Sequence, residues 1–282
     1  MTTRPSLRTE TVNGVFSIVL TRAAEYNTIT PQLRDDLADA IDEGDADPEA
    51  HVILLRAEGP AFCAGYGLDW SVEYQATEES SERAWDSLTD LRNISSFVDV
   101  YMKLWYAWKP TIAAVQGWCI AGGTDMVLCA DMIIAGEGAT FGYPPSRVWG
   151  TPTTAMWVYR MGLERAKRYL LTGDEIPASE AARIGLILEA VPDDDLQERA
   201  TAFATRMAKL PVNQLSMLKL LCNQTAENMG LGSARTLGSL FDGIARHTQE
   251  GQDFVARGQE VGFREAVRER DDPFGDYGSK PR

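Results

Sequence analysis

The sequence is poor in histidine, which limits the catalytic chemistry it can support. Its 282 residues include only two histidines, His51 and His247, and these lie far apart in the chain. Mechanisms built on Ser-His-Asp or Cys-His arrangements therefore have little to work with. Acid–base chemistry must come mainly from carboxylates, tyrosines, backbone groups or water.

Paired cysteines are absent as well. The four cysteines (Cys63, Cys119, Cys129 and Cys222) form no CxxC pair, and two distant histidines complete no zinc-binding pattern. We therefore expect neither a metal site nor a disulfide framework, and we interpret the cysteines as buried reduced thiols.

The chain also lacks positive charge and long apolar runs. It has 27 Lys and Arg against 41 Asp and Glu, a net charge of −14. Such a surface repels phosphate backbones, so we expect no nucleic-acid partner. The start MTTRPSLRTE has no apolar targeting segment, and no apolar run approaches the length that spans a bilayer. We therefore expect a cytoplasmic protein that has no membrane partner.

Short apolar runs alternate with helical patterns in the first part of the chain, which indicates an α/β fold. The predicted strands are Val15–Leu20, Val52–Leu55, Thr111–Val115 and Met132–Ala135. Thr30 and Pro31 carry the signal of a helix start, as N-cap and first helical residue. After Met156 the pattern becomes largely helical, and the last predicted helix is Val261–Arg270. We expect an α/β core over residues 1–191 and a helical C-terminal region over 192–282. The acidic residues 69–90 are expected to form a loop or lid.

Two glycine-rich segments follow predicted strands and carry the main chemical signal. The first is Phe62–Asp69, with the sequence FCAGYGLD, and the second is Gln116–Asp125, with the sequence QGWCIAGGTD. Small residues and glycines leave backbone N–H groups accessible, and amides at a helix start favour a developing anion. Two such amides side by side form an oxyanion hole. Each segment taken alone is equally consistent with a tight turn.

Taken together, these segments resemble the crotonase superfamily, the enoyl-CoA hydratase/isomerase family. The resemblance covers most of the chain and includes several further segments in the family's order. They are Arg22–Asn27, Lys109–Gly117, Cys129–Asp131, Thr140–Gly142, Thr172–Gly173, Ala178–Gly185 and Arg270–Phe274.

This resemblance implies a crotonase-like spiral of repeated ββα units with a helical C-terminal trimerisation part. It implies an acyl-CoA substrate, no cofactor beyond the CoA of that substrate, and a homotrimer or a dimer of trimers. By motif position the oxyanion amides fall on Tyr66 and Gly122, and the Tyr66 ring either shapes the acyl pocket or fills space. The remaining candidate substrate-binding residues are Ala24, Tyr26, Ala64, Gly65, Leu68, Arg147 and Trp149.

The sequence departs from the family at its catalytic acids. Hydratases of the family carry one glutamate after the glycine turn, where this chain has Asp125, which is either catalytic or a helix cap. The second glutamate position falls on Pro145 or Ser146, and neither can act as a carboxylate base. Candidate replacements are Tyr66, Asp69, Glu73 and Arg147. Arg147 either pairs with a substrate carboxylate or forms an ion pair within the protein.

Three functions therefore remain open. The first is an enoyl-CoA hydratase/isomerase-type lyase or isomerase acting through an enolate, with Asp125 and the two amides as the catalytic groups. The second is an acyl-CoA hydrolase or C–C-cleaving enzyme of the same fold. The third is a catalytically weak protein that binds CoA esters.

Overall fold

The computed structural model describes residues 1–67 and 85–277, and within these residues the strands form two sheets. The larger sheet has the order β1-β2-β3-β4-β6-β8-β11, and all pairs from β3 to β11 are parallel. Its strands are β1 (Thr2–Thr3), β2 (Leu7–Val12), β3 (Val15–Leu20), β4 (Val52–Ala57), β6 (Thr111–Val115), β8 (Met132–Gly136) and β11 (Glu189–Val191). The smaller sheet, β10-β9-β7-β5, contains β5 (Ala61–Cys63), β7 (Trp118–Ile120), β9 (Thr140–Gly142) and β10 (Ile176–Pro177).

Successive units of the chain add one strand to each sheet and then a helix. Strands β4 and β5 precede α3 (Ser87–Tyr106), and strands β6 and β7 precede α4 (Gly122–Val127). Strands β8 and β9 then lead towards α5 (Met156–Met161) and α6 (Leu163–Leu170). This repetition is the spiral of ββα units expected from the sequence, and the α/β fold class is confirmed.

Helix α1 (Pro31–Ala46) shows why these residues fold as they do. The Thr30 hydroxyl accepts a hydrogen bond from the Leu33 N–H at 3.1 Å, which satisfies one of the unpaired amides at the helix start. Residues Leu33, Leu37 and Ile41 then recur four apart and are all buried. The predicted cap and the predicted apolar face are therefore both present.

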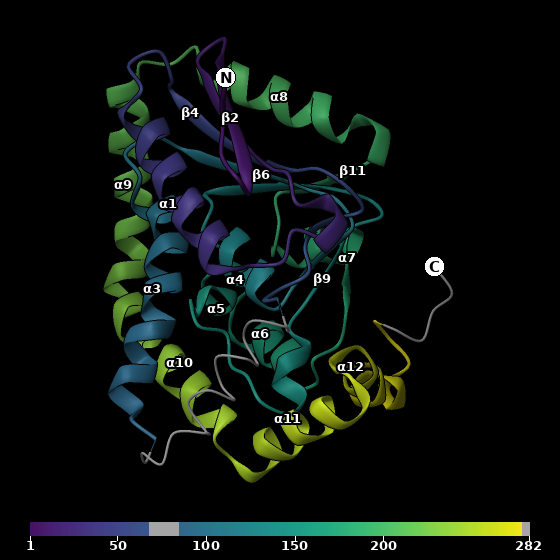
Figure 1. Ribbon diagram of the computed structural model, residues 1–282. Helices are drawn as coiled ribbons and strands as arrows, with labels where there is room; N and C mark the ends of the chain where they lie inside the picture. Colours follow the sequence, from purple (N-terminus) through teal and green to yellow (C-terminus); the bar gives the residue numbers. More distant parts are fainter. Residues whose placement is uncertain (68–84, 278–282) are drawn as a thin grey trace.

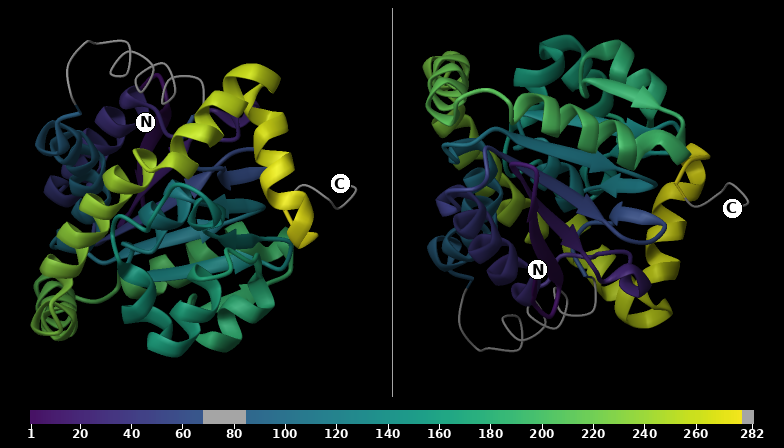
Figure 2. Two further views of the ribbon diagram at one scale, coloured as in Figure 1. Left: turned by 90° about the horizontal axis from the view of Figure 1, so that it is seen from below. Right: turned by 90° about the horizontal axis from the view of Figure 1, so that it is seen from above.

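The helices cover the sheets on opposite sides (Figures 1 and 2). Helix α8 (Leu196–Met207) packs on the outer face of the larger sheet, where Ala200 and Ala204 join Val52 and Ile112 in one apolar cluster. The last helices, α10 (Leu231–Arg246), α11 (Gln249–Val261) and α12 (Phe263–Asp271), run across the other side. The other helices in the described part of the chain are α7 (Ala178–Ile184) and α9 (Val212–Asn228). Its short 3-10 turns are η1 (Ala23–Glu25), η2 (Pro144–Arg147), η3 (Asp193–Asp195) and η4 (Asp272–Phe274).

One predicted helix begins later than expected. The helix predicted over Val261–Arg270 is α12, which starts two residues on, at Phe263, because α11 ends at Val261 and Gly262 separates the two helices. Gly262 has a φ of +86°, a conformation that favours glycine and ends a helix. The C-terminal helical part is confirmed, whereas the boundary at residue 191 stays a prediction.

Across the described residues, none of the helices is both long enough and apolar enough to cross a bilayer. A cytoplasmic location stays a prediction from the sequence.

Candidate active site

Three loops of the candidate site leave neighbouring strands of the smaller sheet. Strands β5, β7 and β9 are parallel neighbours, and they end at Cys63, Ile120 and Gly142. Because the carboxyl ends of parallel strands meet at one edge of a sheet, the loops that follow them lie side by side. The two glycine-rich segments and the Phe-Gly-Tyr-Pro segment are thus gathered in one place.

The two glycine-rich loops are in direct contact. Gly65 has a φ of +92°, and a Cβ at this position would lie 3.1 Å from the Ala121 methyl and 3.7 Å from the Gly122 nitrogen. A Cβ at Gly123 would collide with the carbonyl oxygen of Cys63. The glycines therefore allow a backbone approach that larger residues would block.

The first loop is anchored on the chain that precedes α1. The Ile29 N–H donates to the Gly65 carbonyl at 2.8 Å, and the Gly67 N–H donates to the Ile29 carbonyl at 3.0 Å. The Ala64 N–H donates to the carbonyl of Tyr26 at 3.1 Å. These bonds on either side of Tyr66 fix the direction of the backbone that carries the first oxyanion candidate.

The second oxyanion candidate, Gly122, is the first residue of α4. The N–H of a first helical residue has no acceptor within its own helix, and it carries the partial positive charge of the helix start. The preceding residue, Ala121, has a φ of 52°, which is strained for a residue with a side chain. This turn places the first amide of α4 beside the neighbouring glycine loop, since a Cβ at Gly65 would lie 3.7 Å from the Gly122 nitrogen.

The Tyr66 ring lies directly over this turn. A Cβ at Gly122 would lie 2.6 Å from the ring's Cε2 atom. The ring meets Phe97 edge-on at a centroid distance of 5.5 Å, and its hydroxyl accepts a hydrogen bond from the Tyr101 hydroxyl at 3.1 Å. Burial, followed by the negative charge of Asp125, raises the pKa of the Tyr66 phenol, so this hydroxyl stays protonated at neutral pH.

Asp125 lies on the same helix, one turn after Gly122, and its side chain is completely buried. Its carboxylate accepts hydrogen bonds from the Thr153 hydroxyl at 3.1 Å, the Thr154 hydroxyl at 3.1 Å and the Thr154 N–H at 3.3 Å. Burial raises the pKa of Asp125 to about 7, although these hydrogen bonds act in the opposite direction. Such a carboxyl group exchanges a proton readily near neutral pH, as a general acid or base requires.

The segment after β9 places no carboxylate at the family's second acid position. The carbonyl of Pro145 accepts hydrogen bonds from the amides of Val148, Trp149 and Gly150, and the Ser146 hydroxyl donates to the Tyr143 carbonyl at 2.9 Å. Both residues thus stabilise the turn. Neither can take over the proton transfer of a glutamate.

Arg147 forms an ion pair within the protein. Of the two roles expected from the sequence, this is the second, and pairing with a substrate carboxylate was the first. Its guanidinium is buried and donates to Asp271 at 2.9 Å and to both carboxylate oxygens of Asp276 at 2.8 and 2.7 Å. The same group stacks on the Phe274 ring at 3.9 Å. These contacts attach the C-terminal turn to the segment after β9, and they occupy the donors that a substrate carboxylate would need.

The other predicted binding residues are spread around the loops. Ala24 is exposed on η1, Tyr26 is half-buried beside it, and Trp149 packs against Phe254 of α11 at a centroid distance of 5.1 Å. Leu68, with Asp69 and Glu73, lies outside the described residues. The structure contains no ligand, so contact of these residues with substrate stays a prediction.

The sequence did not indicate the two threonines that surround Asp125 or the half-buried carboxylate of Asp242 on α10. Burial raises the pKa of Asp242, and its partners are Arg246 and the Thr151 N–H. The segment Gly150–Thr154 contains a Thr-Pro-Thr-Thr run, but nothing in that run shows which acid it surrounds.

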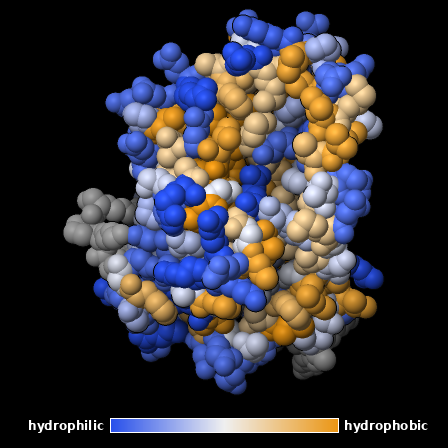
Figure 3. All heavy atoms as spheres, turned by 180° about the vertical axis from the view of Figure 1, so that it is seen from behind, coloured by the Kyte–Doolittle hydropathy of each residue, from blue (hydrophilic) through white to orange (hydrophobic). Residues whose placement is uncertain are grey.

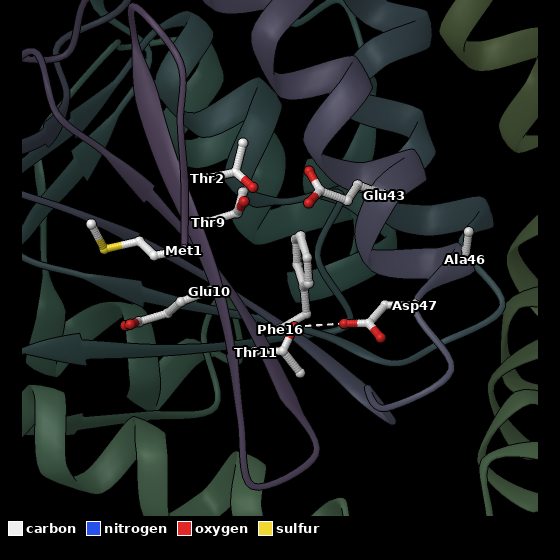
Figure 4. A pocket seen from close by; sticks show the side chains of 9 residues that line it. All are labelled: Met1, Thr2, Thr9, Glu10, Thr11, Phe16, Glu43, Ala46 and Asp47. Carbon is white, nitrogen blue, oxygen red and sulfur yellow. Dashed lines mark hydrogen bonds between the residues drawn. The ribbon is translucent and has the colours of Figure 1, made fainter.

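A separate hollow of about 310 Å³ opens between the N-terminal strands and α1 (Figure 4). Its walls include the acidic residues Glu10, Glu43 and Asp47, and a hydrogen bond from Thr11 lowers the pKa of Asp47. This charge opposes the phosphates of a CoA nucleotide. The hollow is therefore an unfavourable place for a CoA nucleotide, and the glycine loops stay the candidate site.

Comparison with known proteins identifies relatives of this chain. The model of a family described as "Enoyl-CoA hydratase/isomerase" matches residues 10–257. A solved enoyl-CoA hydratase from Mycobacterium smegmatis is 42% identical with a TM-score of 0.92, and the alignment covers 97% of this chain and 96% of that one. An enoyl-CoA hydratase/isomerase from Xanthobacter autotrophicus Py2 is 27% identical with a TM-score of 0.87, over 96% and 99% of the two chains. A hydroxycinnamoyl-CoA hydratase-lyase from Pseudomonas fluorescens is 28% identical over 68% of this chain and 69% of its own length.

Proposed function

Because the chain belongs to the enoyl-CoA hydratase/isomerase family, we propose that it acts on an acyl-CoA thioester through an enolate. The enolate oxygen is held by the backbone N–H groups of Tyr66 and Gly122. The observation that carries this proposal is the contact between the two glycine loops, which brings the start of α4 beside the turn at Gly65. Amides fixed before the reaction stabilise the developing charge without having to reorganise.

Asp125 is the proton-transfer group at Cα in this proposal. It follows Gly122 by one helical turn, so a thioester oxygen at the amide places its Cα near this carboxyl group. A pKa of about 7 lets Asp125 both take and return a proton at neutral pH. The protein needs no cofactor for this step beyond the CoA of the substrate itself.

A panel of enoyl-, hydroxyacyl-, dicarboxyl- and aryl-CoA thioesters, followed by mass spectrometry, tests the proposal. We expect a product that forms only from the thioester. When the reaction runs in D2O, this product should carry deuterium at Cα. Free acid and CoA as the only products would instead show a hydrolase, and a shortened acyl chain would show C–C cleavage. Binding of all thioesters without turnover would show a catalytically weak CoA-ester-binding protein.

We expect Tyr66→Ala to change substrate preference, while the kcat on the preferred substrate changes less. The variant keeps the N–H of residue 66 but removes the ring that covers Gly122. Bulkier acyl groups should therefore gain in relative kcat/KM, by about tenfold if the ring rejects them by roughly 1.4 kcal/mol. Competition between a short and an aryl thioester in one reaction measures this ratio. An unchanged ratio in a folded variant would show that the ring only fills space.

Helix α9 carries an apolar surface that we propose is covered by a second copy of the chain in a homotrimer or a dimer of trimers. The surface, here called the α9 surface, consists of Met217, Leu218, Leu220, Leu221 and Met229, all of them exposed. Apolar atoms also gather along the side of the molecule that carries α9 (Figure 3). Contiguous apolar side chains of this kind are unfavourable in water and mark interfaces between proteins.

Light scattering tests this assembly. We expect a mass several times the 31.1 kDa of one chain at micromolar concentration. Leu221→Glu should release smaller species, because it places a charge on the α9 surface. Leu171→Glu is the matched control, since Leu171 is equally exposed but lies at the end of α6. A stable wild-type species near 31.1 kDa would contradict the proposal.

A further inference from the structure

Asp242 of α10 lies against the same stretch of backbone that holds Asp125. One oxygen of its carboxylate accepts a hydrogen bond from the Thr151 N–H at 3.3 Å, and it lies 3.4 Å from where a Cβ on Gly150 would be. Three residues later the Thr154 N–H donates to Asp125, also at 3.3 Å. Three extended residues span at most about 11 Å, so one short segment carries both carboxyl groups.

Helix α10 is fixed to this segment by further contacts. The Thr151 hydroxyl donates to the Gly238 carbonyl at 2.9 Å, and the Ser239 hydroxyl donates to the Thr153 carbonyl at 3.3 Å. A Cβ at Gly238 would lie 2.5 Å from the Pro152 oxygen, so the helix and the segment touch through their backbones. The fold therefore sets the position of Asp242 relative to Asp125 and the two threonines that bind it.

Two tyrosines lie within the influence of both carboxyl groups. Burial raises the pKa of Tyr66 and of Tyr143, and the negative charges of Asp125 and Asp242 each add to both shifts. The Tyr143 hydroxyl donates to the Thr151 carbonyl at 2.8 Å, beside the amide that binds Asp242. Since the backbone of Tyr66 is a proposed wall of the oxyanion hole, Asp242 belongs to the surroundings of that hole.

Asp242 is held in a setting that keeps it able to titrate. Burial raises the pKa of Asp242, Arg246 at 3.4 Å opposes this shift, and the negative charge of Asp90 adds to it. Arg246 binds Asp90 more closely, at 2.8 Å, and Asp90 is almost fully buried, whereas the Asp242 side chain is 18% exposed. Asp90 thus anchors the arginine between α3 and α10, while Asp242 keeps access to solvent.

We propose that Asp242 supplies the second acid–base carboxyl group of the site, in place of the glutamate missing at Pro145 or Ser146. This inference rests on the proposed acyl-CoA function. It assigns to a helix near the C-terminus a role that the family pattern would place directly after β9. It also makes hydration of a double bond available to a site that would otherwise have Asp125 alone.

The reaction balances with these two groups. The ionised Asp242 takes a proton from a water molecule as the water oxygen bonds to Cβ. The electron pair of the Cα=Cβ bond moves to form the enolate, whose oxygen is held by the two amides. The enolate then collapses, and Cα takes the proton of the neutral Asp125. The product is a 3-hydroxyacyl-CoA, and transfer of one proton from Asp242 to Asp125 restores the enzyme.

The test compares two reactions of the same variants. Asp242→Asn should lower the hydration kcat by at least about a hundredfold, since the amide cannot accept the water proton. Exchange of the Cα hydrogen of a saturated acyl-CoA with D2O needs only Asp125 and the amides, and it should stay within about threefold. Asp125→Asn should lose both reactions.

Asp90→Asn is the control for a merely structural role, because it removes the other carboxylate partner of Arg246. We expect it to lower the melting temperature but to keep hydration at the pH optimum within about threefold. The acidic side of its pH–rate profile for hydration should move to lower pH, because the charge of Asp90 raises the pKa of Asp242 and the variant lacks that charge. The charged and titratable groups around Asp242 are Arg246, Asp90, Tyr66, Tyr143 and Asp125.

Two results with the variants would overturn the inference alone. One is hydration near the wild-type rate in a folded Asp242→Asn variant. The other is that both the Asp242→Asn and the Asp90→Asn variants lose hydration and exchange together and have a lower melting temperature. A wild-type enzyme that exchanges but never hydrates would also overturn it and leave the proposed function standing. A wild type that neither exchanges nor converts any thioester would overturn the proposed function, and this inference with it.

Discussion

Asp125→Asn should lower kcat by about a hundredfold to ten-thousandfold and, at pH 8, should raise the stability of the protein. The amide keeps the size of the carboxylate but cannot exchange a proton. Its oxygen can still accept from the Thr154 hydroxyl, while its NH2 group donates to the Thr153 hydroxyl. Binding of the CoA ester should change little, because the oxyanion amides remain. The measurement is kcat beside the melting temperature of the same preparation.

The gain in stability follows from the pKa of Asp125. Its pKa in the folded protein is about 7, against 3.8 for an unperturbed Asp, so the folded state favours the neutral form. The wild type therefore loses stability as pH rises from about 4 to about 7, by up to about 4 kcal/mol at roughly 1.4 kcal/mol per pKa unit. Asn carries no such cost above pH 7, and the two proteins should converge near pH 4.

A helix cap would behave differently. Asn caps a helix about as well as Asp, so a capping role predicts near-wild-type activity and no pH-dependent gain in stability. Wild-type turnover in the folded Asn variant would remove Asp125 from the mechanism. Asp242 and Tyr66 would then be the remaining described acid–base candidates.

The second large effect is expected at the oxyanion hole. Replacing Gly122 by Pro deletes the N–H that we assign to the enolate oxygen, and it should lower kcat by about a hundredfold or more. Gly122 is the first residue of α4, a position that accepts proline because its N–H has no partner in the helix.

The design of this test depends on the Tyr66 ring. Any Cβ at residue 122 would meet that ring at 2.6 Å, so the comparison belongs in a Tyr66→Ala background. In that background Gly122→Ala adds a Cβ and keeps the amide, whereas Gly122→Pro adds a similar bulk and removes it. Equal turnover of the two double variants, both folded, would exclude the Gly122 amide from catalysis.

The two glycine loops could be predicted from the sequence because the causes of each loop are local. Each loop directly follows an apolar strand, and glycines mark the points where the backbones touch. The start of α1 could be predicted for the same reason. Thr30 binds an amide of the first turn, and Pro31 occupies the first helical position. Patterns of this range indicate the elements. The contact of the two loops depends on the pairing of β5 with β7, which are not among the strands predicted from the sequence.

The surroundings of Asp125 and Arg147 could not be predicted in the same way. The pKa of Asp125 depends on complete burial and on Thr153 and Thr154, and the pairing of Arg147 depends on a turn at the other end of the chain. Asp242 belongs to a helix whose packing on Thr151 has no local signal. Such contacts arise only when distant segments fold together, so the sequence left open what replaces the missing glutamate.

The most direct measurement of the central claim is deuterium exchange at Cα of an acyl-CoA in D2O, followed by mass spectrometry. We expect exchange into the thioester and no exchange into the matching acyl amide, whose Cα hydrogen is less acidic. Exchange should disappear in Asp125→Asn and in the Tyr66→Ala/Gly122→Pro variant, and it should persist in Asp242→Asn. A folded wild-type protein that binds acyl-CoA thioesters but exchanges none of them would contradict an enolate held by Tyr66 and Gly122.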